Sequence, residues 1–389
     1  MAQELTRRDV VAFRTRAHGL DAAPGSVHDP DELRVLDLGV QDTGSDGALW
    51  ALVVRGLALG ADPWDGLALA WTLRGAPHAY RRRDLAAVAV ATAPLSPDDA
   101  AKRVFDAAKP LREAGVPVLD SLREIAALER EIVAEPTVKG DLSTRLTAHL
   151  RPEQLRWCAP CQATHSWELP FRLAALQAGL ELEPGTSPPV LRRVPGLEPP
   201  GYARAGTEAE PRFDVVRAYL RVFGPATVRE VAAYVDAPAR DVQARWPGDA
   251  VEVEVVDVEP TLLRGRPEPR YLLADDLADL AGRAGTDTPA PAVHLLGPFD
   301  PYLQLRDRAT LVPDPATRKD LWRTLGRPGA VVAGGEVLGT WRPRTSGKRL
   351  SVQVTSWAPL DRAAWDGVEA AAARLAAFRG VPLAGVERG

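Results

Sequence analysis

Cysteine is nearly absent from this chain, which has only two among 389 residues. A framework of several disulfide bonds is therefore excluded. No run of about 18 apolar residues occurs, so the sequence predicts no membrane span. The first residues, MAQELTRRDVVAF, lack the apolar segment of a secretory signal. These absences predict a cytoplasmic protein.

An excess of positive charge is also missing. The chain has 48 Lys and Arg against 52 Asp and Glu, a formal net charge of -4. This balance argues against nucleic-acid binding through the overall field of the protein. A local basic patch can still supply phosphate contacts, so DNA binding stays open. The length is enough for two or three domains with cores of their own.

Common catalytic motifs do not occur either. The phosphate-binding patterns G-x-x-x-x-G-K-[ST] and G-x-G-x-x-G are absent from any strand–helix setting. G-x-S-x-G and H-E-x-x-H are missing too, which leaves common hydrolase and kinase chemistry without support. We therefore expect no nucleotide cofactor and no other cofactor.

The two cysteines form one short motif, Cys158-Ala-Pro-Cys161, with His165 four residues further on. A C-x2-C pair is found in redox dithiols and as half of a zinc site. A structural zinc needs four ligands, and no second pair completes the set. We favour two partly buried thiols near Trp157 and Trp167, and expect no metal.

The clearest local pattern is a helix-turn-helix core over residues 213–246. Apolar residues at helical spacing mark its first helix: Phe213, Val216, Leu220 and Phe223. Thr227 and Glu230 form a capping box for the second helix, and Pro238 opens a third. In such folds the third helix can enter a DNA groove. A helical bundle used only for packing is the alternative.

Groups of short helices followed by strand signals divide the rest of the chain. We expect the α+β class, built as tandem winged-helix units with a β-rich C-terminal part. The expected divisions are a first unit at 1–94, a second at 95–183, a linker or long loop at 184–212, a third unit at 213–275, and the β-rich part at 276–389 with a terminal helix.

Helical periodicity and turn residues place the individual elements. Thr6 is the expected cap of the first helix, and Gly334-Gly335 is a hairpin signal. The terminal alanine-rich helix runs from Arg362 to Arg379. The other expected helices cover 5–20, 31–40, 47–58, 98–114, 119–134, 143–150 and 167–180, with a short helix or loop at 275–290.

Two predicted hairpins are rich in cations. Arginine binds phosphate oxygens through two parallel hydrogen bonds, so such hairpins are candidates for DNA contact. A solvated loop on an arginine-rich protein is the alternative. The candidates are Arg74, His78, Arg81, Arg82 and Arg83 in the first hairpin, and Arg342, Arg344, Lys348 and Arg349 in the second.

A polar turn, Leu38 to Gly44, follows an apolar helix. The amide of Gln41 can both donate and accept, so it can hold a water or a base edge. A helix end that runs into a turn explains the pattern equally well.

Six stretches together carry a resemblance to a known family. In chain order they are RAHGL, LGVQDT followed by ALWAL, WTLRGAPH, WELPFRLAALQAGL, LLGPFDPYL and GEVLGTWRPR. Over roughly residues 5–360 the chain resembles the bacterial tandem winged-helix DNA glycosylases, the azinomycin-resistance or interstrand-crosslink-unhooking type.

The resemblance implies three winged-helix units in a C-shape around double-stranded DNA, with the β-rich part closing the channel. It also implies a Gln-x-Gln or Gln-x-Asp pair that positions the attacking water. Gln41 matches the first residue, whereas Thr43 stands at the second. Asp42 lies between them and would serve as the carboxylate if the turn were shifted by one residue.

Three hypotheses follow. The first is a monofunctional glycosylase for alkylated or crosslinked bases, with Gln41, Asp42 and Thr43 as its catalytic residues. The second is a non-catalytic DNA-binding protein of the same fold, which the Thr43 departure favours. The third is a protein-interaction scaffold, which the net negative charge favours. The first two imply double-stranded DNA as partner and a place at the nucleoid.

Overall fold

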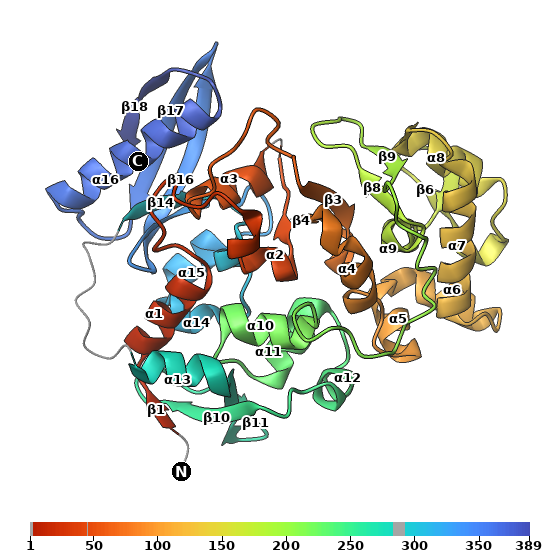
Figure 1. Ribbon diagram of the computed structural model, residues 1–389, viewed down its shortest axis with the longest axis horizontal. Coiled ribbons are helices and arrows are strands. Elements are labelled where there is room, and N and C mark those ends of the chain that lie inside the picture. The colour runs from red at the N-terminus through yellow and green to blue at the C-terminus, as the bar shows by residue number, and fades with distance from the viewer. Residues whose placement is uncertain (1–2, 45, 283–291) are drawn as a thin grey trace.

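The computed structural model describes residues 3–44, 46–282 and 292–389. Residues 35–91 occupy the centre of the molecule (Figure 1). Residues 97–193 stand on one side of them and the C-terminal sheet on the other, while residues 215–273 lie below. The mixture of helices and separate, largely antiparallel sheets confirms the expected α+β class.

Three N-terminal helices form where they were expected but are shorter, and a fourth, over residues 85–91, was not predicted. Thr6 caps the first of them, because its side chain accepts a hydrogen bond from the Asp9 amide. Gly19, with φ +67°, follows the end of this helix. The helices are α1 (Arg7–Ala17), α2 (Val35–Leu38), α3 (Gly47–Val54) and α4 (Leu85–Ala91).

The first predicted hairpin lies inside a six-stranded sheet. The sheet order is β2 (Val40–Gln41), β4 (Pro77–Arg81), β3 (Leu67–Trp71), β8 (Leu180–Leu182), β9 (Val190–Arg193) and β5 (Thr137–Val138). Every residue of β3 is buried. Strand β9 falls in the segment expected to be a linker. The first two expected units therefore share one sheet, because β3 pairs with β8.

The second group of helices surrounds its own apolar core. The helix expected at 98–114 is interrupted at Phe105, whose φ is +51°. The helix expected at 143–150 begins earlier, at Lys139. The elements are α5 (Pro97–Arg103), α6 (Ala108–Glu113), α7 (Val118–Ile132), the hairpin β6 (Leu155–Cys158) and β7 (Ala163–Ser166), α8 (Lys139–Thr147) and α9 (Glu168–Gln177).

The helix-turn-helix core is present as predicted. Thr227 and Glu230 form the expected capping box. Strand β1 (Gln3–Leu5) pairs in parallel with β10, so the N-terminus docks onto this unit. Its elements are α10 (Val215–Phe223), α11 (Val228–Val235), α12 (Ala239–Ala244), β10 (Ala250–Val255), β11 (Leu262–Leu263), β12 (Arg266–Pro267) and β13 (Arg270–Leu273).

The third helix of this core, α12, contacts the start of the second unit. Arg240 forms an ion pair with Asp98. The Asp241 carboxylate accepts a hydrogen bond of 2.6 Å from the Ser96 hydroxyl. The polar face of α12 is therefore docked against the start of α5. The helix thus joins two units of the chain, and its entry into a DNA groove stays a prediction.

The C-terminal part is β-rich, as expected. Gly334 and Gly335 join two of its strands in the predicted hairpin. The chain does not end with the terminal helix, because a further strand, β18, pairs in parallel with β17. The elements are α14 (Arg308–Leu311), α15 (Pro315–Leu321), α16 (Arg362–Phe378), and a sheet ordered β14 (Val293–Leu296), β15 (Gly329–Ala333), β16 (Glu336–Ser346), β17 (Arg349–Ser356) and β18 (Leu383–Arg388).

Helix α13 (Ala274–Gly282) contains the expected boundary between residues 275 and 276. The remainder of the helix or loop expected at 275–290 lies outside the described residues. Among those that are described, no helix is both long and apolar enough to cross a membrane.

Candidate nucleic-acid interface

Gln41 and Thr43 lie side by side at the end of strand β2. The Nε2 atom of Gln41 donates a hydrogen bond of 3.0 Å to the Thr43 hydroxyl oxygen. Gln41 is half-buried and Thr43 is exposed. Strand β2 is one of the two edge strands of its sheet. The amide oxygen of Gln41 and the hydroxyl proton of Thr43 can therefore bind one water together.

The Asp42 carboxylate binds the start of helix α3. Its Oδ1 accepts a hydrogen bond of 2.8 Å from the backbone amide of Ala48, in the first turn of α3. Burial raises the pKa of Asp42, while this hydrogen bond acts in the opposite direction. A carboxylate at a helix N-terminus satisfies amide groups that have no partner within the helix. Asp42 thus fixes α3 against the turn.

A glycine positions β2 against its neighbour. Gly39 has φ +90°, and a Cβ there would lie 2.4 Å from Cζ of Tyr80. The Tyr80 hydroxyl lies 2.8 Å from the Thr72 hydroxyl oxygen. Only glycine allows both this backbone conformation and this contact. The tyrosine ring therefore packs directly against the segment that leads into Gln41.

His78 and Arg81, two candidates from the first hairpin, are buried. His78 is 1 % exposed, and its Nδ1 lies 3.0 Å from both the Thr72 hydroxyl and the Ala76 carbonyl oxygen. Burial, and then the charge of Arg74, lower the pKa of His78 to about 3. Arg81 donates 2.7 Å hydrogen bonds to Asp37 and to the Leu33 carbonyl. We therefore assign these two residues a structural role instead of phosphate contact.

The other cations of this hairpin mainly connect parts of the fold. Arg82 donates hydrogen bonds of 2.8 and 2.7 Å to the two carboxylate oxygens of Glu181 in β8. Arg83 pairs with Asp31. Arg74 donates to the Tyr234 carbonyl oxygen at 2.5 Å, and its guanidinium lies 4.9 Å from the centre of the Tyr234 ring. Since this hairpin is central in a sheet, its charges meet neighbouring elements.

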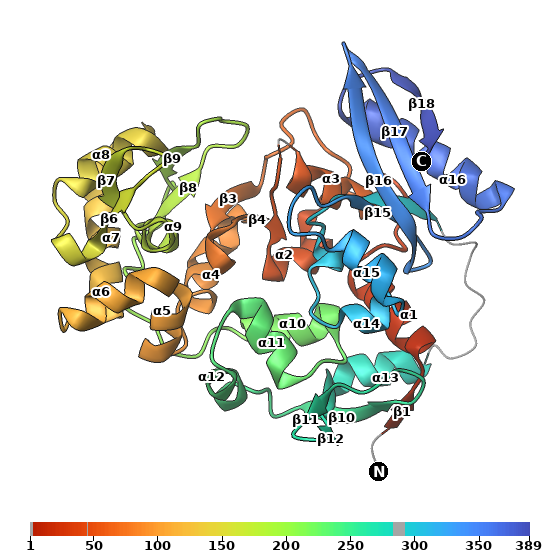
Figure 2. The same cartoon turned by 180° about the vertical axis from the view of Figure 1, so that it is seen from behind.

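The second hairpin, β16–β17, is different because its cations are exposed. Arg342 donates a 2.5 Å hydrogen bond to the Gly326 carbonyl oxygen. Arg344 donates bonds of 3.0 and 2.8 Å to the Gln353 amide oxygen. Within the described residues, Arg342, Arg344, Lys348 and Arg349 form no ion pair. The hairpin projects from the body of the molecule (Figure 2), as a DNA-contacting wing would.

Three further arginines gather near α14 and α15: Arg306, Arg308 and Arg327. None of them pairs with a carboxylate in the described part of the chain. The guanidinium of Arg308 lies 5.0 Å from the centre of the Trp322 ring, and that of Arg327 lies 5.0 Å from the centre of the Phe299 ring. Burial, and then the charges of Arg327 and Arg306, lower the pKa of Arg308 to about 10. Such a concentration of half-buried cations attracts anions.

These arginines adjoin a cavity of about 620 Å³ with basic walls. Arg306 and Arg308 line it together with α15, and Trp322 contributes its apolar surface. The other cations on its lining are Arg318, Lys319 and Arg323.

The charge of Arg74 in the first hairpin acts on two of the arginines beside α14 and α15. After burial, the charge of Arg74 lowers the pKa of Arg306, and the charges of Arg306 and Arg74 lower that of Arg327. Arg342 bonds to Gly326, the neighbour of Arg327. We call Arg74, Arg306, Arg327, Arg342 and Arg344 the cationic track; none of them forms an ion pair with a carboxylate of the described residues. The sequence analysis did not predict that Arg306 and Arg327 belong to this track. The one sequence signal near them was the Arg306-Asp307-Arg308 triplet.

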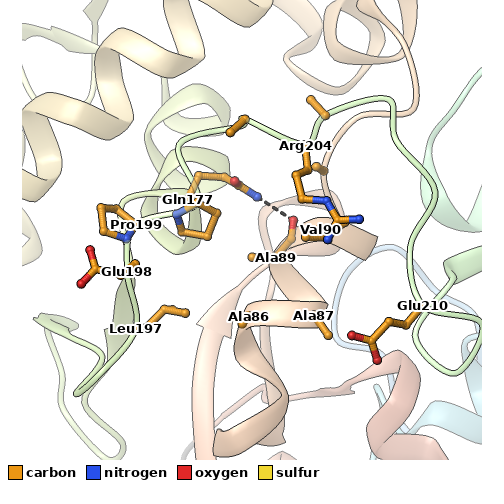
Figure 3. A pocket seen from close by; sticks show the side chains of 14 residues that line it. Ala86, Ala87, Ala89, Val90, Gln177, Leu197, Glu198, Pro199, Arg204 and Glu210 are labelled. Atoms are coloured by element: carbon orange, nitrogen blue, oxygen red, sulfur yellow. Dashed lines mark hydrogen bonds between the residues drawn. The ribbon is translucent and has the colours of Figure 1, made fainter.

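A second pocket lies beside α4 and the end of α9. Figure 3 shows it between α4, the end of α9 and the segment 197–210, with a volume of about 380 Å³. Gln177 spans its base, where Nε2 donates to the Ala89 carbonyl oxygen at 2.7 Å. Glu198 and Glu210 are among its lining residues and would repel phosphate. None of the candidate DNA-binding residues lines this pocket.

Comparisons with known proteins give the family. The model of the family described as DNA glycosylase AlkZ-like matches residues 65–378. The solved structure of Streptomyces sahachiroi DNA glycosylase AlkZ is similar, with a TM-score of 0.69 and 22% identity over 100% of each chain. No curated protein sequence matches this one.

Gln41, Asp42 and Thr43 precede the segment that the family model matches. That segment includes the β3–β4 hairpin, all three arginines near α14 and α15, and the β16–β17 hairpin. Because it covers well over half of the sequence, the chain belongs to the AlkZ-like DNA glycosylase family and is a DNA-binding, glycosylase-like repair protein.

Proposed function

We propose that this protein hydrolyses the N-glycosidic bond of N7-alkylated or crosslinked purines in double-stranded DNA. The observation that carries the proposal is the Gln41–Thr43 pair, which presents a free amide oxygen and a hydroxyl at the edge of β2. Family membership supplies the reaction class.

The reaction places few demands on the protein. An N7-alkylated purine is positively charged, so the bond between C1′ and N9 breaks with its electron pair going to the base, which leaves neutral. The sugar becomes an oxocarbenium ion. A water oxygen then bonds to C1′, and one water proton goes to solvent. The protein has to orient that water and favour the positive sugar.

Gln41 suits the first task. Its Nε2 is held by the Thr43 hydroxyl, which leaves Oε1 to accept a hydrogen bond from the attacking water. Thr43 can donate its hydroxyl proton to the same water, although a hydroxyl is a poor base. Asp42 acts as a positioning residue, because its carboxylate fixes the N-terminus of α3.

The cationic track suits the binding of the sugar-phosphate backbone. Its arginines form no ion pair with a described carboxylate, although the charge of Asp236 raises the pKa of Arg306, and each phosphate that they contact releases condensed counterions. Arg344 and Lys348 on the β16–β17 hairpin would contact one part of the duplex. Arg306 and Arg327 would contact another. Such contacts fix the orientation of DNA without reading its sequence.

The proposal is tested by incubating the protein with duplex DNA that contains 7-methylguanine and measuring abasic sites by alkaline cleavage. We expect strand breaks at the lesion with the wild type and none above background with Gln41→Ala. Absence of breaks with the wild type on alkylated and crosslinked duplexes would overturn the proposal.

One observation favours a second function, non-catalytic DNA binding. The Asp42 carboxylate is engaged with α3, and Thr43 offers no carboxylate, so neither of these two residues supplies a free acidic group to the water beside Gln41. A damage-binding protein would hold the same duplexes without releasing a base. A scaffold that binds no DNA would show no salt-dependent association. A cytoplasmic, nucleoid-associated location remains a prediction.

A further inference from the structure

The β6–β7 hairpin brings Cys158, Cys161 and His165 together. The ligand atoms of these three side chains all lie within 4.8 Å of one another. Cys158 and His165 are half-buried, and Cys161 is exposed. The sequence alone did not require this convergence, because the histidine could have been placed on the opposite face of the hairpin.

Strand pairing explains why the histidine meets the cysteines. His165 is the cross-strand partner of Arg156, which stands two residues before Cys158. Residues two apart on a strand share a face, so Cys158 and His165 are diagonal neighbours on one face. After Cys161 the chain turns back with Gln162 at φ +49°. This turn brings Cys161 to the same end of the hairpin.

The tautomer of His165 is also suited to coordination. Its Nδ1 lies 2.8 Å from the Ser166 carbonyl oxygen, which can only accept a hydrogen bond. Nδ1 therefore carries the proton, and Nε2 keeps its lone pair. Metal-binding histidines commonly have their second nitrogen fixed by a carbonyl in this way.

We propose that Cys158, Cys161 and His165 bind one Zn²⁺ ion, a site that goes beyond the proposed glycosylase function. Two sulfur donors and one nitrogen donor suit zinc better than calcium or magnesium, which prefer oxygen. Both thiols release their protons to solvent when the metal binds. No fourth His, Cys, Asp or Glu of the described chain joins the cluster, so water would take the fourth position and the site would be an open one, unlike a closed four-ligand structural site.

A bound metal would stabilise the hairpin that carries its ligands. Strands β6 and β7 form a two-stranded sheet that pairs with no other strand in the described part of the chain. The hairpin packs against α8, and a two-stranded hairpin depends on such added contacts because it is marginally stable alone. Zinc bound across its turn would tie both strands together and thereby hold this exposed part of the second unit.

The test is a titration of the reduced, metal-free full-length protein with zinc chloride in competition with a chromophoric chelator. We expect one equivalent to bind, and cobalt(II) to give the absorption of a tetrahedral thiolate site. Cys158→Ser and His165→Ala should each weaken zinc binding at least about a hundredfold, since losing even an outer partner of a ligand costs ten- to a hundredfold. His28→Ala, at an exposed histidine outside the cluster, should change nothing.

Circular dichroism of each variant shows whether it is folded. Failure of the reduced wild type to bind zinc would overturn the proposal. So would unchanged zinc affinity in the folded Cys158→Ser and His165→Ala variants. Abasic-site formation is not part of this test, so the zinc site and the glycosylase function can fail independently.

Discussion

Thr43 is the residue whose identity matters most to the chemistry of the turn. Its hydroxyl holds Gln41 but cannot take a proton from water, whereas a carboxylate at this position could. We therefore predict that Thr43→Asp raises the rate of 7-methylguanine release, which single-turnover kinetics would measure. Thr43→Val, which keeps the shape and removes the hydroxyl, should lower it. A slower Thr43→Asp protein would argue against a water held by this pair.

His78 illustrates how burial changes what a residue can do. Its pKa in the folded protein, about 3, is below its ordinary value of 6.5. His78 therefore contributes stability above pH 6.5, and this contribution is lost as the pH falls toward 3. We predict that the imidazole of His78 stays neutral from pH 8 to about pH 4 in histidine-labelled NMR spectra, with His78→Gln identifying the signal. Titration near pH 6.5 would show that the side chain is solvated.

At the scale of elements, the β16–β17 hairpin is the clearest candidate for a DNA-binding wing. Its exposed cations form no ion pairs with described residues, in contrast to Arg82 and Arg83 of the first hairpin. We predict that Arg344→Ala weakens duplex binding and reduces the salt slope of log K by about one, whatever the sequence. Arg123→Ala on α7, where the arginine already pairs with Asp120, is the matched control. Equal salt slopes for the two variants would exclude the hairpin.

The sequence predicted helices better than strands. Caps such as Thr6 and Thr227 and the glycines of the β15–β16 turn act locally, so they could be recognised in the sequence. Strands β9 and β18 depend on partners that lie far away in the chain. Their short sequences carry no strong signal without those partners. The docking of α12 was missed for the same reason, because its partners Ser96 and Asp98 lie far from it in the sequence.

At the scale of the whole molecule, buried ion pairs connect distant segments. Asp307 accepts hydrogen bonds from Arg14 of α1 at 2.8 Å and from Arg270 of β13 at 2.7 Å. Burial alone would raise the pKa of Asp307, but the two guanidiniums hold it well below its ordinary value. The carboxylate therefore joins the N-terminal helix, the third unit and the C-terminal part.

We predict that Asp307→Ala lowers the free energy of unfolding by about 3–5 kcal/mol, because it leaves the buried Arg14 without a carboxylate and Arg270 with only Glu230, at 3.8 Å. Chemical denaturation would measure the loss. Asp320→Ala, which removes an exposed ion pair with Arg323, should cost at most about 1 kcal/mol. Similar losses for both variants would mean that the Asp307 network does not hold the segments together.

The candidate site was only partly visible in the sequence. Gln41 and Thr43 were found because they are two residues apart in one turn, and Arg342 and Arg344 because they share one hairpin. Arg306 and Arg327 come close to Arg74 only through the folded chain. No spacing in the sequence predicts that encounter. The burial of His78 and Arg81 was missed for the same reason, since β2 and the segment before α2 cover them.

The most direct test of the account separates base release from DNA binding at Gln41. Wild type and Gln41→Ala would be compared under single-turnover conditions at saturating protein on a 7-methylguanine duplex, with released base and dissociation constant both measured. The account predicts that release falls at least about a hundredfold while the dissociation constant stays within about twofold, because the cationic track holds the DNA. Equal rates of release for the two proteins would contradict it.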